Sequence, residues 1–377
     1  MLYRIGDIYA ERSERGAADM ELLSVTMNGG VMQRSEIEGK DNSSEDKSNY
    51  KVVRKGDMVY NSMRMWQGAN GVSSYDGIVS PAYTVLTAKV SICNEYFAAL
   101  FKNYKLINEF RKNSQGMTSD TWNLKYPQIE TIKVYLPEVA EQEKVASMLV
   151  TLDKRIAAQA TLVEQLKKYK RGVMQRIFRN MSMLSPSGFE TVQLSAIFKK
   201  ISRRNSNEEI KNVITNSAEY GLIPQRDFFD KDIAVDGNTS NYYVIEHGDF
   251  VYNPRKSNTA PYGPFNRYER EERGIISPLY TCLVLQADIE PSYLAWYFKS
   301  DAWYRYIYDN GSQGVRHDRV SMTDGLLRGI PVIIPSKEAQ LKIAKLLDCL
   351  ESRFQTELSQ YESLKSIRVA LLQQLFI

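Results

Sequence analysis

The feature that most constrains this sequence is an internal duplication that runs through nearly the whole chain. VVRKGDMVYN, ending at Asn61, returns as YVIEHGDFVYN, ending at Asn253, and GIVSPAYTVL from Gly77 returns as GIISPLYTCL from Gly274. The offset between the copies grows from 189 residues near the start to 198 from Ser114 onward, which indicates a few loop insertions in the second copy. Such a repeat predicts two copies of one structural unit.

Each copy begins with a segment of about 135 residues that mixes strand and helix patterns. Short β-branched and aromatic runs bounded by Gly, Asn, Asp and Pro predict strands and turns. These runs are DMVYN, YTVLTAKV and IKVYLP in the first copy and DFVYN, YTCLVL and IPVIIP in the second. A helical pattern follows the central strand of each copy, over 95–112 and 292–308. The expected fold class is therefore mixed α/β.

Each copy ends in a long heptad segment that begins just after Pro137 or Pro335. Apolar positions spaced alternately by four and three residues are typical of a coiled coil, and a helix of this length spans roughly 60 Å. The seam positions are Val145, Leu149, Leu152, Ile156, Gln159, Val163, Leu166, Lys170, Val173 and Ile177 in the first segment, and Ile343, Leu347, Leu350, Phe354, Glu357, Tyr361, Leu364, Arg368, Leu371 and Leu375 in the second.

Polar residues interrupt the two seams at equivalent places and predict how the helices pair. A polar residue in a seam costs stability but fixes the register. In an antiparallel pair the partners have a constant sum of residue numbers, and a sum of 527 pairs Gln159 with Arg368 and Lys170 with Glu357. We therefore expect an antiparallel coiled coil within the chain, with pseudo-two-fold symmetry. The alternative is that these helices pair with other chains.

These patterns divide the chain into five segments. They are a first α/β domain (1–137), a first long helix (138–180), a breaker-rich linker (181–188), a second α/β domain (189–335) and a second long helix (336–377).

Composition excludes several classes of protein. The 377 residues carry a formal net charge of +4 and are 43% hydrophobic, which is ordinary for a soluble protein. No apolar run reaches membrane-spanning length and the N-terminus lacks the apolar stretch of a signal peptide, so we expect a cytoplasmic protein without a membrane span. The three cysteines lie far apart in sequence and there are only two histidines, so we expect neither disulfides nor a metal site.

No catalytic constellation is visible in the sequence. Walker A, Rossmann, G-x-S-x-G and H-E-x-x-H patterns are all missing. SPAY (80–83) and SPLY (277–280) superficially resemble the loop with which amino-methyltransferases hold a flipped base. However, their first residue is Ser and no glycine-rich cofactor loop precedes them, so we interpret them as structural turns. We expect a non-catalytic chain that binds no cofactor.

The duplicated motifs together resemble the specificity subunit of a type I restriction-modification enzyme. The closing segments are PEVAEQEKVASMLVTLDKRI (137–156) and PSKEAQLKIAKLLDCLESRF (335–354), and the upstream signatures are GD-x-V-Y-N and G-I-[VI]-S-P-x-Y. One small departure is that the second copy has Glu338-Ala339-Gln340 where the first has Glu141-Gln142. The resemblance covers nearly the full chain.

The resemblance implies a DNA-binding role. Each α/β domain would be a target recognition domain that reads one half of a bipartite, asymmetric sequence in double-stranded DNA. The long helices would set the gap between the half-sites and recruit two methyltransferase subunits, which restriction and translocase subunits then join. The chain itself would carry out no bond chemistry.

Candidate DNA contacts are polar or basic residues in loops of the two domains. Arg can read guanine and Asn or Gln can read adenine, whereas Lys more often holds phosphate. Asn61 and Asn253, kept in both copies, could equally be turn residues. The candidates are Arg34, Asn61, Arg64, Trp66, Gln67, Asn70, Ser114, Gln115, Thr118, Trp122, Asn123 and Lys125 in the first domain, and Arg203, Arg204, Gln225, Arg226, Asn253, Arg255, Lys256, Asn258, Ser312, Gln313, Arg316, His317 and Arg319 in the second.

Two other functions remain open from the sequence. A duplicated coiled-coil adaptor that binds protein partners would show no selectivity for DNA. A fragment of an amino-methyltransferase would bind its cofactor by itself, but the missing glycine loop argues against that.

Overall fold

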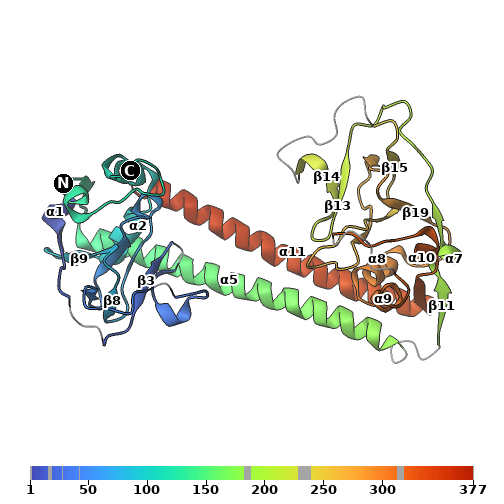
Figure 1. The fold of residues 1–377 in the computed structure, drawn as a ribbon, viewed down its shortest axis with the longest axis horizontal. Helices are drawn as coiled ribbons and strands as arrows, with labels where there is room; N and C mark the ends of the chain where they lie inside the picture. Colours follow the sequence, from blue (N-terminus) through green and yellow to red (C-terminus); the bar gives the residue numbers. More distant parts are fainter. Residues whose placement is uncertain are drawn as a thin grey trace. The chain divides into compact units, whose positions relative to one another are not determined.

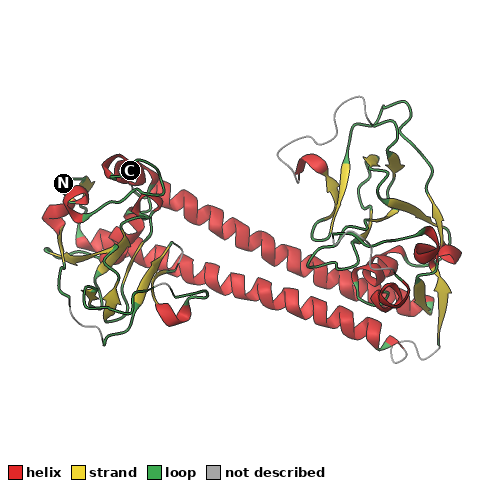
Figure 2. Ribbon diagram, viewed as in Figure 1, coloured by secondary structure: helices red, strands yellow, loops and turns green. Residues whose placement is uncertain are grey.

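The chain forms two compact units, each of which holds one α/β domain and a part of both long helices (Figure 1, Figure 2). Unit 1 consists of Met1–Thr161 with Ser359–Ile377, and unit 2 consists of Leu162–Leu358. The computed structural model describes residues 2–15, 19–27, 29–41, 43–181, 188–227, 239–311 and 318–376.

The sheets of unit 1 are antiparallel and short. A four-stranded sheet has the order β2-β9-β6-β7, and three two-stranded pairs, β1-β10, β3-β4 and β5-β8, surround it. The strands are β1 (Leu2–Arg4), β2 (Tyr9–Glu11), β3 (Leu23–Thr26), β4 (Gly30–Gln33), β5 (Lys51–Val53), β6 (Met58–Asn61), β7 (Asn70–Val72), β8 (Gly77–Val79), β9 (Tyr83–Ala88) and β10 (Lys133–Tyr135).

Unit 2 repeats this topology strand for strand. The four-stranded order is β12-β19-β16-β17, and the pairs are β11-β20, β13-β14 and β15-β18. All six predicted strand runs are confirmed, and the sequence duplication is a duplication of one fold. The strands are β11 (Phe189–Gln193), β12 (Phe198–Lys200), β13 (Ile214–Ser217), β14 (Gly221–Pro224), β15 (Tyr243–Ile245), β16 (Phe250–Tyr252), β17 (Phe265–Arg267), β18 (Gly274–Ile276), β19 (Thr281–Leu285) and β20 (Pro331–Pro335).

Short helices connect the strands of both units. In unit 1 they are α1 (Ile5–Ile8), η1 (Arg34–Glu36), η2 (Met65–Gln67), α2 (Asn94–Leu100), α3 (Tyr104–Asn113) and α4 (Tyr126–Ile129). In unit 2 they are α7 (Leu194–Ile197), η3 (Gln225–Asp227), α8 (Pro291–Lys299), α9 (Tyr304–Asn310) and α10 (Asp324–Arg328).

Each of the two helical segments predicted within the domains is in fact a pair of helices. Asn103 separates α2 from α3, because its side chain accepts a hydrogen bond from the backbone nitrogen of Lys105 at 2.9 Å and so begins a new helix. Ser300 ends α8, where its hydroxyl donates to the carbonyl of Tyr297 at 2.6 Å.

The hydrophobic core of each unit extends from the sheet onto both long helices, α5 (Val139–Arg179) and α11 (Lys337–Gln374). In unit 1, Leu149 of α5 and Leu372 of α11 are buried in one cluster with residues of β6, α2 and α3. In unit 2, Phe178 of α5 and Leu347 of α11 are buried with residues of β16 and α8. Each domain therefore packs on a piece of the helix that follows it and on a piece of the other long helix.

The long helices run antiparallel within each unit, but the predicted pairing of their polar seam residues is wrong. Lys170 forms an ion pair with Glu351 at 2.5 Å, whereas the prediction paired it with Glu357. The guanidinium of Arg368 contacts both carboxylate oxygens of Asp153, one of them at 3.0 Å, whereas the prediction paired Arg368 with Gln159.

The residue numbers of both observed ion pairs total 521 instead of the predicted 527. Glu351 and Asp153 each directly follow a seam leucine, so the observed register differs from the prediction by about one heptad. A shift by one heptad keeps the same residues in the seam, and the periodicity alone therefore does not distinguish the two registers.

Candidate nucleic-acid interface

Two candidate segments of unit 1 lie together although they are far apart in sequence. The loop around η2 contacts the segment 114–125, where Leu124 donates its backbone N–H to the carbonyl of Ser62 at 2.9 Å. The rings of Trp66 and Trp122 meet edge to face, with centroids 5.2 Å apart. The guanidinium of Arg111, near the end of α3, lies 5.6 Å from the centre of the Trp66 ring. The result is an aromatic pair with a cationic neighbour, formed by three separate segments.

Polar side chains around this tryptophan pair are accessible. Arg64 is exposed, and its guanidinium has no partner among the described residues. Thr118 and Lys125 are exposed as well, while Gln67 is half-buried. The side chains of Arg64, Gln67 and Lys125 can donate hydrogen bonds to a ligand, as a DNA-reading surface requires, while the Thr118 hydroxyl lies 3.4 Å from that of Thr121.

The segment 114–125 forms an ordered loop. Gln115 and Asn123 exchange two backbone hydrogen bonds, of 3.0 and 2.8 Å. Inside the loop, the hydroxyl of Thr121 donates to the carbonyl of Thr118 at 2.9 Å. Met117 is fully exposed beside this turn, with a relative accessibility of 100%. The loop thus presents an apolar side chain on a locally fixed backbone.

Unit 2 brings the equivalent segments together in the same way. Val320 donates its backbone N–H to the carbonyl of Pro254 at 2.8 Å, and Lys256 donates its own to the carbonyl of Asp318 at 2.9 Å. Arg255 and Asn258 are exposed in the loop that follows β16.

The remaining basic groups of this region are less free. Lys256 and Arg319 are half-buried, and the Arg319 guanidinium lies 3.6 Å from the carboxylate of Asp318. Four predicted contacts lie outside the described residues: Ser312, Gln313, Arg316 and His317.

Two predicted DNA contacts are wrong, because their side chains are buried. Asn70 is 0% exposed and its amide donates to the carbonyl of Gly68 at 3.1 Å. Asn253 is 7% exposed and its amide donates to the carbonyl of Asn216 at 3.1 Å.

The duplicated asparagines at the ends of β6 and β16 have the same structural task. Asn61 accepts a hydrogen bond from the backbone nitrogen of Met63, and Asn253 accepts one from Arg255, each at 3.0 Å. Both side chains therefore support a turn, which was one of the two roles that the sequence left open for them.

Three of the predicted arginines stabilise the domain in which each of them lies. Arg34 donates to the carbonyls of Ile37, Gly39 and Lys40 at 2.6, 3.0 and 2.8 Å. Arg204 donates to the carbonyl of Asn241 at 2.5 Å and stacks on Tyr243, 4.6 Å from the ring centre.

Arg203 has an exact counterpart in the first copy. It forms an ion pair with buried Asp249, as Arg12 does with Asp57 at 2.9 Å. Burial raises the pKa of Asp249 above its ordinary value, and the guanidinium opposes that shift by stabilising the charged carboxylate. The guanidinium groups of Arg203 and Arg12 are therefore both engaged in ion pairs within the fold.

The other predicted residues differ in exposure. The hydroxyl of Ser114 donates to the carbonyl of Phe110 at 2.7 Å and so ends α3. Asn123 is half-buried in the ordered loop, and Gln115 is exposed. In η3, Gln225 is half-buried and Arg226 is exposed.

Sequence reasoning did not select Arg111 or Met117, although both lie beside candidate contacts. Arg111 belongs to a helical pattern with many charged residues, and its contact with Trp66 depends on the tertiary fold. Met117 lies between the predicted residues Gln115 and Thr118. It is an apolar residue, and its full exposure can be seen only in the structure.

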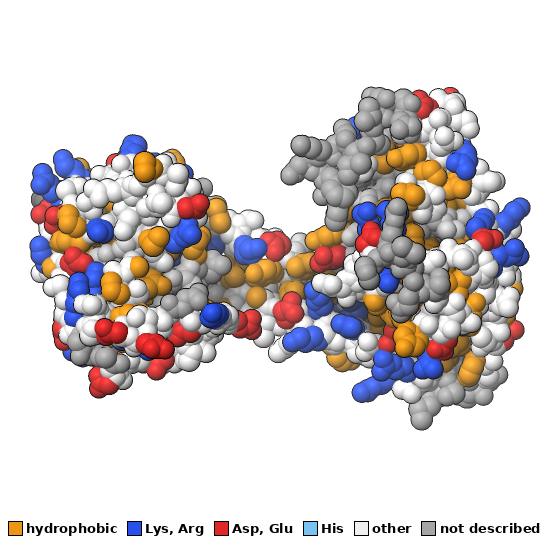
Figure 3. Space-filling model, viewed as in Figure 1, with side chains coloured by type: hydrophobic (Ala, Val, Ile, Leu, Met, Phe, Trp, Pro, Cys, Tyr) orange, Lys and Arg blue, Asp and Glu red, His pale blue; other side chains and the backbone are white. Residues whose placement is uncertain are grey.

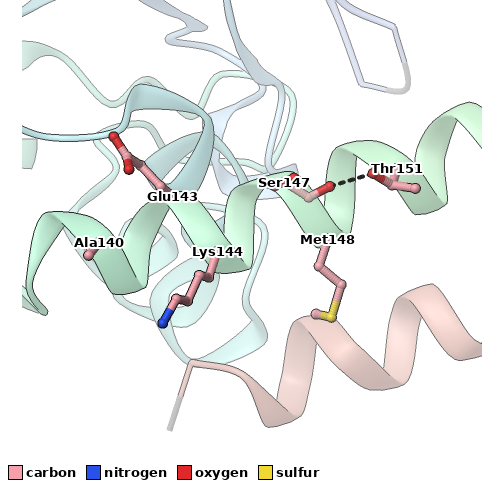
Figure 4. A pocket seen from close by; sticks show the side chains of 6 residues that line it. All are labelled: Ala140, Glu143, Lys144, Ser147, Met148 and Thr151. Atoms are coloured by element: carbon pink, nitrogen blue, oxygen red, sulfur yellow. Dashed lines mark hydrogen bonds between the residues drawn. The ribbon is translucent and has the colours of Figure 1, made fainter.

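A second surface feature lies on the first half of α5, within unit 1. Six side chains of one helix face border an open hollow of about 640 Å³: Ala140, Glu143, Lys144, Ser147, Met148 and Thr151 (Figure 4). Met148 is 40% exposed. At the equivalent positions of α11, 198 residues later, stand Leu341, Lys342 and Leu346, and both leucines are exposed to about half.

Neither the charges on the visible face nor the metal-ligand groups of the described residues mark a competing site. In the space-filling view, lysine and arginine side chains are scattered over both units with acidic side chains between them (Figure 3). Within the described ranges, no group of three or more His, Cys, Asp or Glu side chains is placed to hold a metal ion. Of the helices in the described part of the chain, none has the length and apolar composition needed to cross a membrane.

Comparison with known proteins supports the resemblance drawn from the sequence. Residues 8–168 match the family model described as "Type I restriction modification DNA specificity domain". The MjaVIII type I restriction enzyme specificity subunit of Methanocaldococcus jannaschii is 30% identical over 130 residues. That alignment covers 34% of this chain and 29% of the relative, so the chain matches less than a third of that protein's length.

Solved structures share the fold over the whole chain. The HsdS subunit from Thermoanaerobacter tengcongensis has a TM-score of 0.54 at 16% identity, and covers 100% of this chain and 96% of its own. The type I restriction-modification S subunit from M. genitalium has a TM-score of 0.57 at 15% identity, with the same coverage. The predicted fold class, two tandem α/β domains with long helices, is confirmed.

Proposed function

We propose that this chain, a member of the type I restriction-modification specificity subunit family, reads a bipartite DNA sequence with its two α/β domains. The observation that carries this proposal is a duplicated scaffold with different loops. RMWQGANG (64–71) and PRKSNTAPYG (254–263) follow equivalent strands, β6 and β16, yet differ in sequence. Two domains of one fold with different loops would read two different half-sites, and the target would be asymmetric.

We assign the two recognition domains to residues 1–137 and 189–335. In the first, Arg64, Gln67, Thr118 and Lys125 supply hydrogen-bond donors around the tryptophan pair. Arg and Gln suit base edges in the major groove, and Lys suits phosphate. In the second, the exposed Arg255 and Asn258 and the half-buried Lys256 and Arg319 have the same position in the fold.

Each long helix has an equivalent exposed face near its start, and this duplication favours binding of two identical protein partners. Lys144 and Met148 on α5 correspond to Lys342 and Leu346 on α11. An exposed apolar side chain next to a lysine, present twice, suits two copies of one partner. We assign these faces to two methyltransferase subunits, which restriction and translocase subunits would join. The chain itself would place these catalytic subunits on chosen adenines, without chemistry of its own, in the cytoplasm where the DNA lies.

The deciding experiment is selection from random DNA duplexes with the full chain co-purified from its native lysate. We expect enrichment of a two-part motif with a fixed, unspecific gap. If no motif is enriched and the purified material holds no methyltransferase, the proposal fails and a coiled-coil adaptor with protein partners takes its place.

A further inference from the structure

Two buried glutamines occupy equivalent positions at the start of the long helices. Gln142 lies in the first turns of α5 and Gln340 in those of α11, 198 residues apart. Their side chains are only 1% and 3% exposed. Because a buried amide needs partners for both its oxygen and its nitrogen, the partners show which parts of the fold it joins.

In unit 1, Gln142 joins the long helix to two other parts of the domain. Its Oε1 accepts a hydrogen bond from the backbone nitrogen of Cys93 at 2.9 Å. Its Nε2 donates to the carbonyl of Pro137 at 2.9 Å. Cys93 is the N-cap of α2, and Pro137 lies in the connection from β10 to α5. One side chain therefore ties together a domain helix, the connection and the long helix.

In unit 2, Gln340 makes the same two bonds. Its Oε1 accepts from the backbone nitrogen of Glu290 at 2.9 Å, and its Nε2 donates to the carbonyl of Pro335 at 2.8 Å. Glu290 is the N-cap of α8 and Pro335 is the last residue of β20. All partner atoms belong to the backbone, so the arrangement persists although the side chains at the N-caps, Cys93 and Glu290, differ.

We propose that Gln142 and Gln340 are positioning residues that fix the direction in which each long helix leaves its recognition domain, and so fix the gap between the half-sites. The inference rests on the proposed function. A helix of about 60 Å moves its far end by about 3.4 Å, one base-pair step, when its start rotates by roughly 3°. The hydrophobic core holds the long helix against the domain, and we expect the two hydrogen bonds to fix the remaining angle between them.

The test repeats the selection on duplex libraries in which the gap between the half-sites varies. The variants are Gln142→Met and Gln340→Met, which keep the side-chain length and remove both hydrogen bonds. Gln165→Met and Gln360→Met are matched controls, because these glutamines are exposed on the same two helices. We expect the variants to keep both half-site sequences while the preference for the wild-type gap falls roughly threefold or more, since the span between linked readers sets avidity. The controls should keep the wild-type gap.

Other outcomes separate this inference from the proposed function. If the variants keep the wild-type gap preference, the glutamines serve stability alone and the inference is overturned. If the wild-type chain itself enriches no two-part motif, the proposed function fails. Should Gln142→Met lose its half-site through unfolding, Gln340→Met tests the inference by itself, because that substitution lies in unit 2 and leaves unit 1 unchanged.

A second measurement needs no DNA. Spin labels on Lys55→Cys in the domain and Lys154→Cys on α5, both exposed positions of unit 1, report the angle between domain and helix. Cys93 and Cys349 are replaced by Ser for this purpose, and Cys282 is buried. The distance distribution should broaden in Gln142→Met and stay unchanged in Gln165→Met. An equal width in both variants would overturn the inference.

Discussion

Arginine side chains have two different tasks in this fold, and their surroundings separate them. Arg203 forms an ion pair with a buried carboxylate and Arg34 donates to three backbone carbonyls, so both side chains already satisfy acceptors within the fold. Arg64 and Arg255 are exposed in loops after equivalent strands. An arginine that already satisfies internal acceptors stabilises the domain, whereas one without them can read a base or a phosphate.

Replacing Arg64 with alanine is expected to weaken DNA binding without destabilising unit 1. A bidentate base contact contributes about 1–3 kcal/mol, whereas a phosphate contact would reduce the salt dependence by about one unit of slope. Titration of the selected duplex at several salt concentrations measures both. Arg34→Ala is the matched control and should lower the melting temperature instead. Unchanged DNA affinity in Arg64→Ala would contradict the assignment.

A further prediction concerns the pH dependence that Glu351 gives to unit 2. Burial tends to raise its pKa, but the hydrogen bonds from Gln355 and Lys170 and the positive charges of Lys170 and Lys299 together outweigh burial, and the pKa lies below the ordinary 4.5. A lowered carboxylate pKa stabilises the fold above the unfolded-state pKa, and the contribution disappears as pH falls through the folded-state value.

Glu351→Gln should therefore destabilise the protein by about 1 kcal/mol at pH 7 and by much less below pH 4.5. Urea unfolding of both proteins at pH 7 and pH 3.5 gives the comparison. A difference of equal size at both pH values would show that the lowered pKa contributes nothing.

At the level of single elements, the long helices show what a heptad pattern does and does not specify. The pattern predicts which residues face the seam, and the burial of Leu149, Val163 and Leu347 agrees with it. The pairing between the helices is fixed by additional contacts, namely the two ion pairs and the packing of each helix against a domain. Both ion pairs occur at equivalent places, since Lys170 corresponds to Arg368 and Glu351 to Asp153.

A double-mutant cycle tests this register. Lys170→Met combined with Glu351→Gln should show a coupling energy of about 0.5–1.5 kcal/mol, because the two charges are in contact and partly shielded from water. Lys170→Met combined with Glu357→Gln should show a coupling below about 0.3 kcal/mol. Denaturant unfolding measures each free energy. The opposite ranking would restore the register with a sum of 527.

At the level of the whole molecule, duplication would let one chain read an asymmetric target, as we propose. The strand order is the same in both units, so the two domains share one scaffold while their loops differ. Changes in one set of loops leave the other domain intact, because each unit has its own hydrophobic core.

An exchange of loops should therefore alter one half-site only. Transfer of residues 255–262 into the place of 64–70 is expected to change the half-site read by the first domain and to leave the second half-site and the gap unchanged. Selection from random duplexes measures all three properties at once. A change in both half-sites would contradict the independence of the two readers.

The sequence by itself determined the duplication, the strands and the long helices, and it showed the resemblance to type I restriction-modification specificity subunits. These features are recorded in local periodicity and in repeated motifs, such as the runs that became β6 and β16. It also marked the equivalent loops at Arg64 and Arg255, because the turn residues around them identify where each strand ends.

Only the tertiary structure decided which residues are accessible and which partners they have. Asn70 and Asn253 are of a residue type that often contacts DNA bases, but their side chains are buried. The neighbour of Trp66 is Arg111, and the partner of Lys170 is Glu351, 181 residues away. Burial and pairing depend on segments that meet through folding, and a periodic pattern is unchanged by a shift of one heptad. For this reason the sequence predicted the helices and strands, while tertiary packing determined the register of the long helices and the exposure of each side chain.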